Sequence, residues 1–506
     1  MKAFSKKVLL MNCSVLMPVI GLEAQSPNVV FILADDLGYG DISALNPNSK
    51  IRTTEIDKLS NNGITFTDAH SGSSVSTPSR YGLLTGRYAF RTSLKNGVLD
   101  GYSRPLISPE RNTIASFLSK NGYATACIGK WHLGWNWANN PETNEVDYSK
   151  PITNGPLSRG FDYFYGMASS LDMPPYVYVE QNQPTAIPNR ISKADQGLKL
   201  FRAGPQSPDF EPEDCLPNFT KRAINYIVSK KDSKQPFFLY LPLTAPHTPI
   251  LPSEKFQGLS GLSPYGDFVL MVDDAVGQIV EALKQSGLYE NTIIVFTSDN
   301  GCYHGAGMRD MEAQGHYSSY IYRGSKSDIF DGGHRVPLII SWGEKYDRIR
   351  EEGIVSMTDF YSSFAQMVGY EQKSNEGEDS YSFWPVINRT GKSSRNDVVH
   401  HSIDGSFSIR EGRWKLVFCA GSGGWSYPSL PKDKDAISKL PDLQLYDMSS
   451  NPEENENLAG KEPEVVEKLT VKMRKYISDG RSTPGIRQKN ETDGEWIQTK
   501  LFMPEE

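Results

Sequence analysis

The stretch NVVFILADD, residues 28–36, decides the fold of this chain. Its apolar residues follow one another without alternation and stop at two carboxylates, Asp35 and Asp36. A run that is apolar on both faces is typical of a strand buried inside a parallel or mixed sheet. The same shape recurs in FFLYLPLTAPH (237–247), TIIVFTSDNG (292–301) and VPLIISW (336–342). The sequence therefore predicts a sheet with buried central strands.

Amphipathic segments lie between these runs. NTIASFLSKNGY (112–123) has Thr113 at its start and Gly122 as a stop, and a longer segment that ends near Gly287 carries Val272, Val276, Ile279, Val280 and Leu283 on one face. Both patterns are typical of helices. Strands that alternate with helices predict an α/β domain with a large, mixed, mostly parallel sheet sandwiched by helices. We place this domain at residues 25–390.

The pattern changes after residue 390. GSFSIREGRWKLVF (405–418) and LQLYDM (443–448) indicate short antiparallel strands, and an apolar stripe over residues 463–477 indicates a helix. We therefore expect a smaller C-terminal α+β subdomain with a short antiparallel sheet at residues 391–506. Residues 135–215 are rich in Pro, Asn and Tyr without periodicity, which is typical of long functional or disordered loops.

Residues 1–24 have the pattern of a signal peptide. Three lysines precede an apolar run over residues 8–22, and the sequence LEA then ends at Ala24. LMNC (10–13) lacks the small residues expected before a lipid-modified Cys13, and no later stretch reaches transmembrane length. We expect an exported, periplasmic protein without a membrane span. The net charge of −7 argues against nucleic acid as a partner.

The remaining cysteines predict neither a zinc site nor a redox motif. They are scattered without a CxxC pair, at Cys127, Cys215, Cys302 and Cys419. One or two disulfides fit an oxidising compartment, but we expect buried free thiols.

Polar residues that suit a reaction centre follow several of the apolar runs. They are Asp35 and Asp36, Lys130 and His132 in CIGKWHLGW (127–135), His247 in APHTP, and Asp299 and Asn300 in TSDNG. Each alone is weak evidence, because such residues also cap turns. If the carboxylates converge, a cation has to compensate them. Carboxylate and amide oxygens favour a hard ion, Ca²⁺ or Mg²⁺. The remaining candidates are basic residues: Arg80, Lys130, His132, His247 and Lys326. A divalent cation surrounded by these side chains fits an anionic substrate group such as sulfate or phosphate.

SVSTPSRYGLLTGRY (74–88) predicts a helix start beside this centre. Pro78 suits a first helical turn, with Ser76 or Thr77 as the cap. A helix N-terminus attracts anions, and Arg80 can reach back to the same point.

The chain resembles the type I, formylglycine-dependent sulfatases of the alkaline phosphatase superfamily. Their signature is Cys or Ser, any residue, Pro, any residue, Arg, four residues and Thr-Gly, which residues 76–86 match. The resemblance spans nearly the whole mature chain, and its further motifs occur in family order: FILADDLGYGD, GKWHLG, APHTP, FTSDNG, RGSKSDIFDGGHRVP and REGRWKLV…LYDMSSNPEENENLA.

The resemblance implies a role for each matching residue. Ser76 is oxidised to formylglycine, whose hydrate attacks sulfur with one hydroxyl and expels sulfate with the other. One Ca²⁺ is held by Asp35, Asp36, Ser76, Asp299 and Asn300. Arg80 and Lys130 stabilise the hydrate, His132 takes a proton from it, and Lys326 and His247 contact the sulfate. His247 is also the acid for the departing sugar oxygen.

This chain carries Ser where most relatives carry Cys. The Ser form depends on a bacterial maturation enzyme of anaerobic, radical type, which agrees with a bacterial exported protein. We expect hydrolysis of carbohydrate O-sulfate esters. The alternatives are a phosphatase or phosphodiesterase of the same superfamily and a catalytically silent sulfoglycan-binding protein with unmodified Ser76. No GxSxG elbow supports a plain serine hydrolase.

Two loops suit sugar recognition. In YGMASSLDMPPYVYVE (165–180), Asp172 can hydrogen-bond a hydroxyl, and Tyr176 or Tyr178 can stack on a ring. The alternative is that Asp172 caps a turn before the two prolines and the tyrosines belong to the core. His316 in MEAQGHYSSYIY (311–322) is a candidate for the rim. The first loop and DGRSTPG (479–485) resemble bacterial relatives of arylsulfatase A and N-acetylgalactosamine-6-sulfatase. This favours exo-acting removal of a 6-O-sulfate from galactose or N-acetylgalactosamine of mucin or glycosaminoglycan.

Two sequence features stay without a function. Asp273-Asp274 suits the solvated face of a helix. His400-His401 is a candidate for a second metal site, but the pair belongs to the C-terminal subdomain and lies far in sequence from any carboxylate pair.

Overall fold

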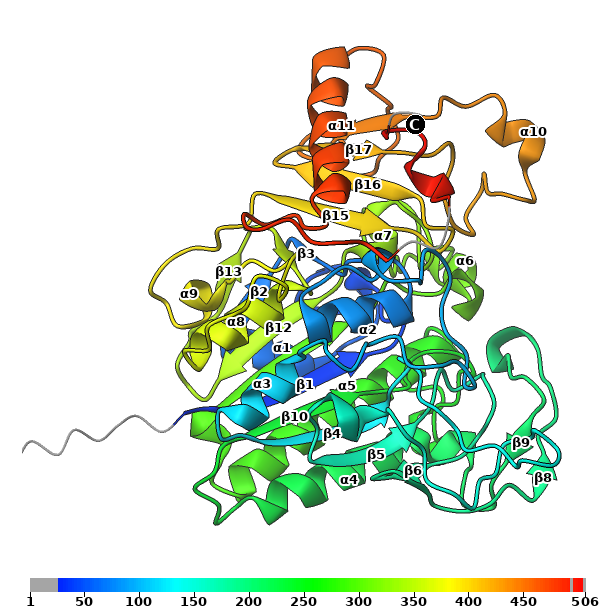
Figure 1. The fold of residues 1–506 in the computed structure, drawn as a ribbon, viewed down its shortest axis with the longest axis vertical. Helices are drawn as coiled ribbons and strands as arrows, with labels where there is room; N and C mark the ends of the chain where they lie inside the picture. Colours follow the sequence, from blue (N-terminus) through cyan, green and yellow to red (C-terminus); the bar gives the residue numbers. More distant parts are fainter. Residues whose placement is uncertain (1–25, 492–494, 504–506) are drawn as a thin grey trace, which may run out of the picture.

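The computed structural model describes residues 26–491 and 495–503 (Figure 1). Its large sheet has the strand order β13-β2-β12-β11-β1-β10-β4-β5-β6-β7. A separate four-stranded sheet lies above it, beside helix α11 (Figure 1). The expected signal peptide, residues 1–24, lies outside the described residues.

The centre of the large sheet is parallel. β1 (Asn28–Ala34) pairs in parallel with both β10 (Phe237–Pro242) and β11 (Thr292–Ser298). β4 (Ala124–Lys130) and β5 (Tyr163–Met167) continue the parallel order beyond β10. β12 (Leu338–Trp342) is antiparallel to β11, so the sheet is mixed but mostly parallel, as predicted. The outer strands are β2 (Gly63–Phe66), β13 (Ile349–Glu351), β6 (Val179–Glu180) and β7 (Gln183–Pro184).

Helices cover both faces of this sheet, which explains the unbroken apolar run of β1. Val30 and Ile32 pack with one core, and Val29, Phe31 and Leu33 pack with the other. The first core includes α1 (Thr54–Asn61), α4 (Cys215–Ser229) and α5 (Pro264–Gln285). The second includes α2 (Ser76–Thr85), α3 (Ile114–Lys120) and α8 (Asp359–Met367). Both sides of the strand are therefore removed from water, as the predicted sandwich requires.

The helix signals in the sequence hold with two corrections. Thr113 caps α3, because its side chain accepts a hydrogen bond from Ser116 N at 3.1 Å. The predicted capping of α2 by Ser76 or Thr77 is wrong: the helix begins at Ser76 and its N-cap is Val75. Asp273 is also not on a solvated face, since it is buried and accepts hydrogen bonds from Glu55 N and Ile56 N at the start of α1.

The C-terminal part is an antiparallel sheet covered by one helix. Its strands are β15 (Asp397–His401), β16 (Phe407–Glu411), β17 (Trp414–Val417) and β18 (Gln444–Asp447). α11 (Pro463–Ser478) packs on them through Leu469 and Met473. Backbone contacts of β15 with residues 72–74 place this sheet directly beside the N-terminus of α2.

The remaining elements are short. They are β3 (Ala69–His70), β8 (Arg190–Ile191), β9 (Pro205–Gln206), α6 (Met308–Glu312), α7 (Asp331–His334), β14 (Val355–Ser356), α9 (Trp384–Ile387) and α10 (Lys434–Ile437).

Cys127, Cys215, Cys302 and Cys419 are free thiols, and the first three are buried. Within the described ranges, we find no helix with the length and apolarity that crossing a membrane requires.

Candidate active site

The ends of two neighbouring strands bring the predicted oxygen ligands together. Asp35 and Asp36 follow β1, Asp299 and Asn300 follow β11, and the two strands are in register to Ala34 and Ser298. Asp36 N donates to Asp299 Oδ1 at 3.2 Å. Asn300 Nδ2 donates to Asp36 Oδ1 at 2.7 Å. All four side chains are almost completely buried, so three carboxylates and one amide share a site without bulk water.

The backbone turns sharply at Asp36, which has a φ of 64°. This left-handed conformation is uncommon outside glycine and marks functional sites when the surroundings enforce it. Tyr265 Oη lies 3.1 Å from the carbonyl oxygen of Asp36 and 2.6 Å from Asp41 Oδ2. Hydrogen bonds from Tyr265 therefore stabilise the loop after β1, although no sequence motif indicated this tyrosine.

The first residue of α2 points into the same site. Ser76 Oγ lies 3.3 Å from Asp35 Oδ1 and 3.4 Å from Asn300 Oδ1. Lys130 Nζ lies 3.3 Å from the same hydroxyl. Ser79 lies in the same helix but faces away from this site, since its hydroxyl donates to the carbonyls of Ser73 and Val75.

Each carboxylate of the site has its own buried cation. Lys130 Nζ contacts both Asp35 oxygens, at 2.9 and 2.8 Å. Arg80 donates to Asp299 Oδ2 through Nε at 3.0 Å and through its terminal nitrogen at 2.8 Å. Lys326 Nζ donates to Asp36 Oδ2 at 2.7 Å. Three charges of each sign therefore compensate one another away from water.

These neighbours also set the protonation states. Burial alone would raise the pKa of Asp35, but Lys130, His247 and Arg80 outweigh it and hold this pKa below its ordinary value. Burial lowers the pKa of Lys130 despite the attraction of Asp35. Burial also opposes the charge of Lys326, but Asp36 prevails and raises its pKa. Asp35 is therefore ionised throughout the physiological range.

The arrangement fits a hard divalent cation. Ligand atoms of Asp35, Asp36 and His247 lie within 4.8 Å of one another. Asn300 and Asp299 add further oxygens through the contacts given above. Buried carboxylate and amide oxygens are the donors that Ca²⁺ and Mg²⁺ prefer. His247 Nε2 is 3.6 Å from Asp36 Oδ2 and completes the cluster on its outer side.

One ring nitrogen of His132 has no hydrogen-bond partner among the described residues. Its Nε2 lies 2.7 Å from the carbonyl oxygen of Leu99, an acceptor that requires Nε2 to carry the hydrogen. Its buried Nδ1 has no hydrogen-bond partner among the described residues. Burial, together with Lys130 and Arg80, holds the pKa of His132 far below its ordinary value. The ring is therefore neutral, with a free lone pair on Nδ1.

His247 and Asp172 lie next to each other beside the carboxylate cluster. His247 Nδ1 is 2.5 Å from the carbonyl of Thr248, which leaves Nε2 facing the carboxylate cluster. Asp172 Oδ1 is 4.0 Å from His247 Nδ1, is buried and has no hydrogen-bond partner among the described residues. Its other oxygen pairs with the half-exposed Arg202. Arg202 was missed in the sequence because it lies in the aperiodic segment 135–215 without a motif.

Two candidate sugar contacts have other partners. Tyr176 is completely buried, stacks on Phe201 with ring centroids 4.1 Å apart, and donates to backbone carbonyls. Both nitrogens of His316 are engaged, Nδ1 with Lys50 N at 3.2 Å and Nε2 with Asp41 Oδ1 at 2.8 Å. Neither side chain offers a free polar atom to a ligand, and His316 instead supports the loop after β1.

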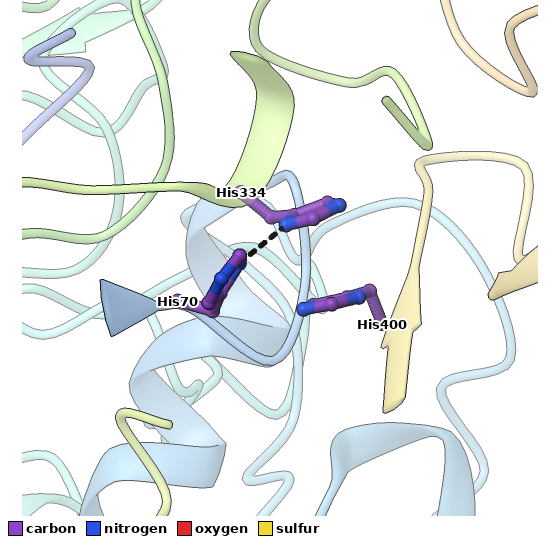
Figure 2. A group of neighbouring side chains, drawn as sticks. All are labelled: His70, His334 and His400. Carbon is purple, nitrogen blue, oxygen red and sulfur yellow. Dashed lines mark hydrogen bonds between the residues drawn. The ribbon is translucent and has the colours of Figure 1, made fainter. Parts of the chain in front are cut away.

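A second buried cluster brings together the two-stranded β14-β3 sheet, α7 and the C-terminal sheet. It contains His70 from β3, His334 from α7 and His400 from β15 (Figure 2). His70 Nδ1 is 3.1 Å from His334 Nδ1, and His70 Nε2 is 2.8 Å from Asp68. The rings of His334 and His400 stack with centroids 3.6 Å apart and planes at 11°. Ring lone pairs lie in the ring planes, so these two stacked rings do not aim at one common ion. His70 and His334 are hydrogen-bonded to each other, and His400 stacks on His334; we call these three residues the histidine seam.

Comparisons with known proteins agree with this geometry. The pattern of the family described as Sulfatase matches residues 27–370. The chain is 32% identical to the N-acetylgalactosamine-6-O-sulfatase of Bacteroides thetaiotaomicron, over 89% of this chain and 93% of that protein. It is also 32% identical to human arylsulfatase A, over 92% of this chain and 90% of that protein.

A solved structure is similar over nearly its full length. It comes from work on the metabolism of multiple glycosaminoglycans by Bacteroides thetaiotaomicron. The TM-score is 0.79 at 30% sequence identity, and the match covers 89% of this chain and 99% of that one.

Proposed function

Since this chain belongs to the sulfatase family and is a sulfuric ester hydrolase, we propose that its substrate is a carbohydrate O-sulfate. The proposed group is the 6-O-sulfate of a terminal galactose or N-acetylgalactosamine in mucin or glycosaminoglycan. The similarity to a named N-acetylgalactosamine-6-O-sulfatase supports this choice. Asp172 supports it as well, because Arg202 pairs with its Oδ2 and leaves the buried Oδ1 free, 4.0 Å from His247 Nδ1.

One observation carries the proposal: Ser76, at the start of α2, faces Asp35, Asn300 and Lys130 in a buried site. We propose that a radical-type bacterial maturation enzyme converts Ser76 to formylglycine, whose hydrated aldehyde supplies the nucleophilic hydroxyl. The intact match of residues 76–86 to the family signature supports this modification.

We propose one Ca²⁺ held by Asp35, Asp36, Asp299, Asn300 and residue 76. When bound, the ion supplies positive charge that polarises a sulfate oxygen. The buried oxygen donors support this set, and a divalent ion suits a site that has to accept a further negative charge from sulfate.

The remaining roles belong to side chains around this centre. Lys130, which is 3.3 Å from Ser76 Oγ, and Arg80, which pairs with Asp299, stabilise negative charge on residue 76. His132 accepts a proton at Nδ1, which is free and neutral. Lys326 binds a sulfate oxygen. The imidazolium form of His247, whose Nδ1–H donates to the carbonyl of Thr248, gives its Nε2 proton to the departing sugar oxygen. The almost complete burial of all these groups limits the access of water.

We also propose that residues 1–24 direct export to the periplasm, residues 25–390 form the catalytic domain and residues 391–506 the C-terminal subdomain. The lysine-rich start followed by an apolar run supports the export signal. The separate antiparallel sheet supports the subdomain.

The test combines modification and activity. Protein matured in a host with the Ser-type system is digested, and the peptide containing Ser76 is weighed; a loss of two hydrogens indicates formylglycine. Sulfate release is then followed with positional isomers of sulfated galactose, N-acetylgalactosamine and N-acetylglucosamine. We expect release from the 6-sulfates of the first two sugars, abolished by Ser76→Ala and by chelation.

Other outcomes reject parts of the proposal. If Ser76 is entirely unmodified in protein made in a host with the Ser-type maturation system, the formylglycine mechanism is contradicted and a sulfoglycan-binding role is favoured. Activity confined to N-acetylglucosamine or uronic acid sulfates contradicts the sugar assignment. Phosphate release that exceeds sulfate release contradicts the choice of sulfate ester.

A further inference from the structure

An exposed tryptophan of the C-terminal subdomain lies next to the catalytic loop. Trp425 is 38% exposed, although large aromatic side chains are mostly buried elsewhere in the chain. Its backbone N is 3.0 Å from Ser327 Oγ and 3.0 Å from Asp328 Oδ1. Ser327 directly follows Lys326, the residue proposed to bind sulfate. Trp425 is therefore tied within one residue of the reaction centre.

The loop that carries Trp425 is held rigidly. Asp328 accepts hydrogen bonds from Trp425 N and Ser426 N, both at 3.0 Å, and also from the hydroxyl of Ser426. Gly424 packs so closely that an added Cβ would lie 2.5 Å from Ser327 O and 2.5 Å from Asp328 Oδ1. An exposed aromatic ring on a fixed backbone has a low entropy cost of binding, which suits a recognition surface.

Trp425 belongs to a cluster of aromatic rings beside the site. Its ring centroid is 5.7 Å from that of Tyr303 and 5.9 Å from that of His304. Lys326 Nζ in turn lies 5.7 Å from the Tyr303 ring. Tyr303 is only partly buried and His304 is exposed. The rings therefore extend from the sulfate-binding lysine to the protein surface, which we call the Trp425 platform (Tyr303, His304 and Trp425).

Cationic side chains lie near this platform. Lys326 Nζ is 5.7 Å from the Tyr303 ring, and Lys432, Arg309 and Lys326 add to the effect of partial desolvation in lowering the pKa of His304, while Asp328 opposes them. A partly apolar surface with nearby cations fits a sugar ring whose neighbours carry carboxylate or sulfate groups. A neutral glycan would not use these cations.

We propose that the Trp425 platform is a binding subsite for a second sugar of an anionic oligosaccharide, on the side of the sulfated residue that leads into the chain. This inference rests on the proposed function, because it takes the sulfate to lie at Lys326. The apolar face of the sugar stacks on Trp425, and its acidic substituents face Lys432 and Arg309. The enzyme thereby distinguishes glycosaminoglycan chains from single sulfated sugars.

The test compares a long and a short substrate. One is a chondroitin 6-sulfate hexasaccharide with a terminal 6-sulfated N-acetylgalactosamine, and the other is 4-methylumbelliferyl sulfate. Trp425→Ala should lower kcat/KM for the hexasaccharide about tenfold, mostly through KM, and leave the aryl ester within about twofold. Trp425→Phe should restore most of the loss. Tyr427→Ala is the matched control, because Tyr427 lies in the same loop but faces a separate cavity with Leu440 and Tyr446.

Binding separates this inference from the proposed function. Calorimetry with the Ser76→Ala protein and the hexasaccharide requires no turnover, and adding Trp425→Ala should weaken binding about tenfold. If wild-type protein releases no sulfate while this binding loss is found, the platform stands and the proposed function fails. If Trp425→Ala binds the hexasaccharide as Ser76→Ala alone does, or if it slows both substrates equally, the platform is refuted.

Discussion

Lys130 Nζ lies 2.9 and 2.8 Å from the two carboxylate oxygens of Asp35 and 3.3 Å from Ser76 Oγ. One buried ammonium thus faces both a proposed metal ligand and the proposed nucleophile. The contact spans two elements, because Lys130 ends β4 while Ser76 begins α2. The charge of Lys130 is therefore available to Asp35 and to Ser76 at once.

Replacement of Lys130 should lower kcat more than it weakens substrate binding. We expect Lys130→Met to lower kcat for an aryl sulfate about 10²- to 10³-fold, because one preorganised charge at the reacting atom is lost. Lys58→Met removes an exposed lysine from a surface pair with Glu55 and serves as the control. Steady-state kinetics on both folded variants check this. Turnover of Lys130→Met within threefold of wild type would contradict the role.

Calcium should stabilise the protein through the carboxylate cluster. At about 100 times its Kd, a bound ion adds about 2.7 kcal/mol to the free energy of unfolding. We expect Tm to rise by a few degrees, about 2–5 °C, on addition of Ca²⁺ to chelated protein. Differential scanning calorimetry measures this rise, which Asp299→Asn should remove.

The control for the calcium effect is Asp310→Asn, which changes an exposed carboxylate on α6. It should keep the full rise in Tm. A parallel titration with Mg²⁺ identifies the preferred ion by the larger rise. An unchanged response in Asp299→Asn would refute the proposed ligand set.

Asp172 should matter for sugar substrates and not for aryl esters. Its unpartnered Oδ1 beside His247 can accept a hydrogen bond from a sugar hydroxyl. We expect Asp172→Asn to raise KM for the sulfated sugar about tenfold, since a hydrogen bond to a charged group contributes about 1.5–3 kcal/mol. Kinetics with 4-methylumbelliferyl sulfate should change less than twofold. Asp195→Asn, at an exposed carboxylate of the same long loop region, is the control.

The central sheet and the charged centre were predictable because local signals agree with the fold. The apolar run of β1 needs helices on both faces, and its end fixes Asp35 and Asp36 beside the end of β11. Parallel pairing then forces Asp299 and Asn300 into the same place. No long-range contact has to be guessed for these residues beyond the adjacency of two strands.

Other contacts depend on tertiary packing that no local pattern encodes. Arg202 meets Asp172 across an aperiodic loop, and Tyr265 reaches the carbonyl of Asp36 from the first turn of α5. His316 is of a residue type that is common in active sites, but its two ring nitrogens are hydrogen-bonded to Asp41 and to Lys50 N. The helix start at Ser76 was misjudged because its hydroxyl contacts Asp35 rather than a backbone N–H.

The histidine seam also came from packing, since its members belong to three separate segments. Burial lowers the pKa values of His70, His334 and His400, and Lys415 lowers those of the last two further. The charged groups around them are Asp68, Asp331, Glu454, Arg335, Arg410 and Lys415. Burial raises the pKa of Glu454 to about 7. Protonation of Glu454 at falling pH therefore raises the free energy of unfolding, whereas protonation of the histidines lowers it.

This seam should make the protein acid-sensitive through His400. Below the unfolded pKa of about 6.5, the unfolded chain binds a proton at this position while the folded chain does not. The free energy of unfolding therefore falls as pH falls from about 6.5 towards the lower folded pKa, by up to about 1.4 kcal/mol per pH unit for one histidine.

His400→Phe keeps a ring against His334 but cannot titrate, so its stability should fall less steeply between pH 6.5 and 5. Urea unfolding of both proteins across this range measures the two slopes. Ser408→Ala removes the neighbour 3.3 Å from His400 Nδ1 without removing the titrating ring, and it should keep the wild-type slope. Equal slopes for wild type and His400→Phe would mean that the acid sensitivity originates elsewhere.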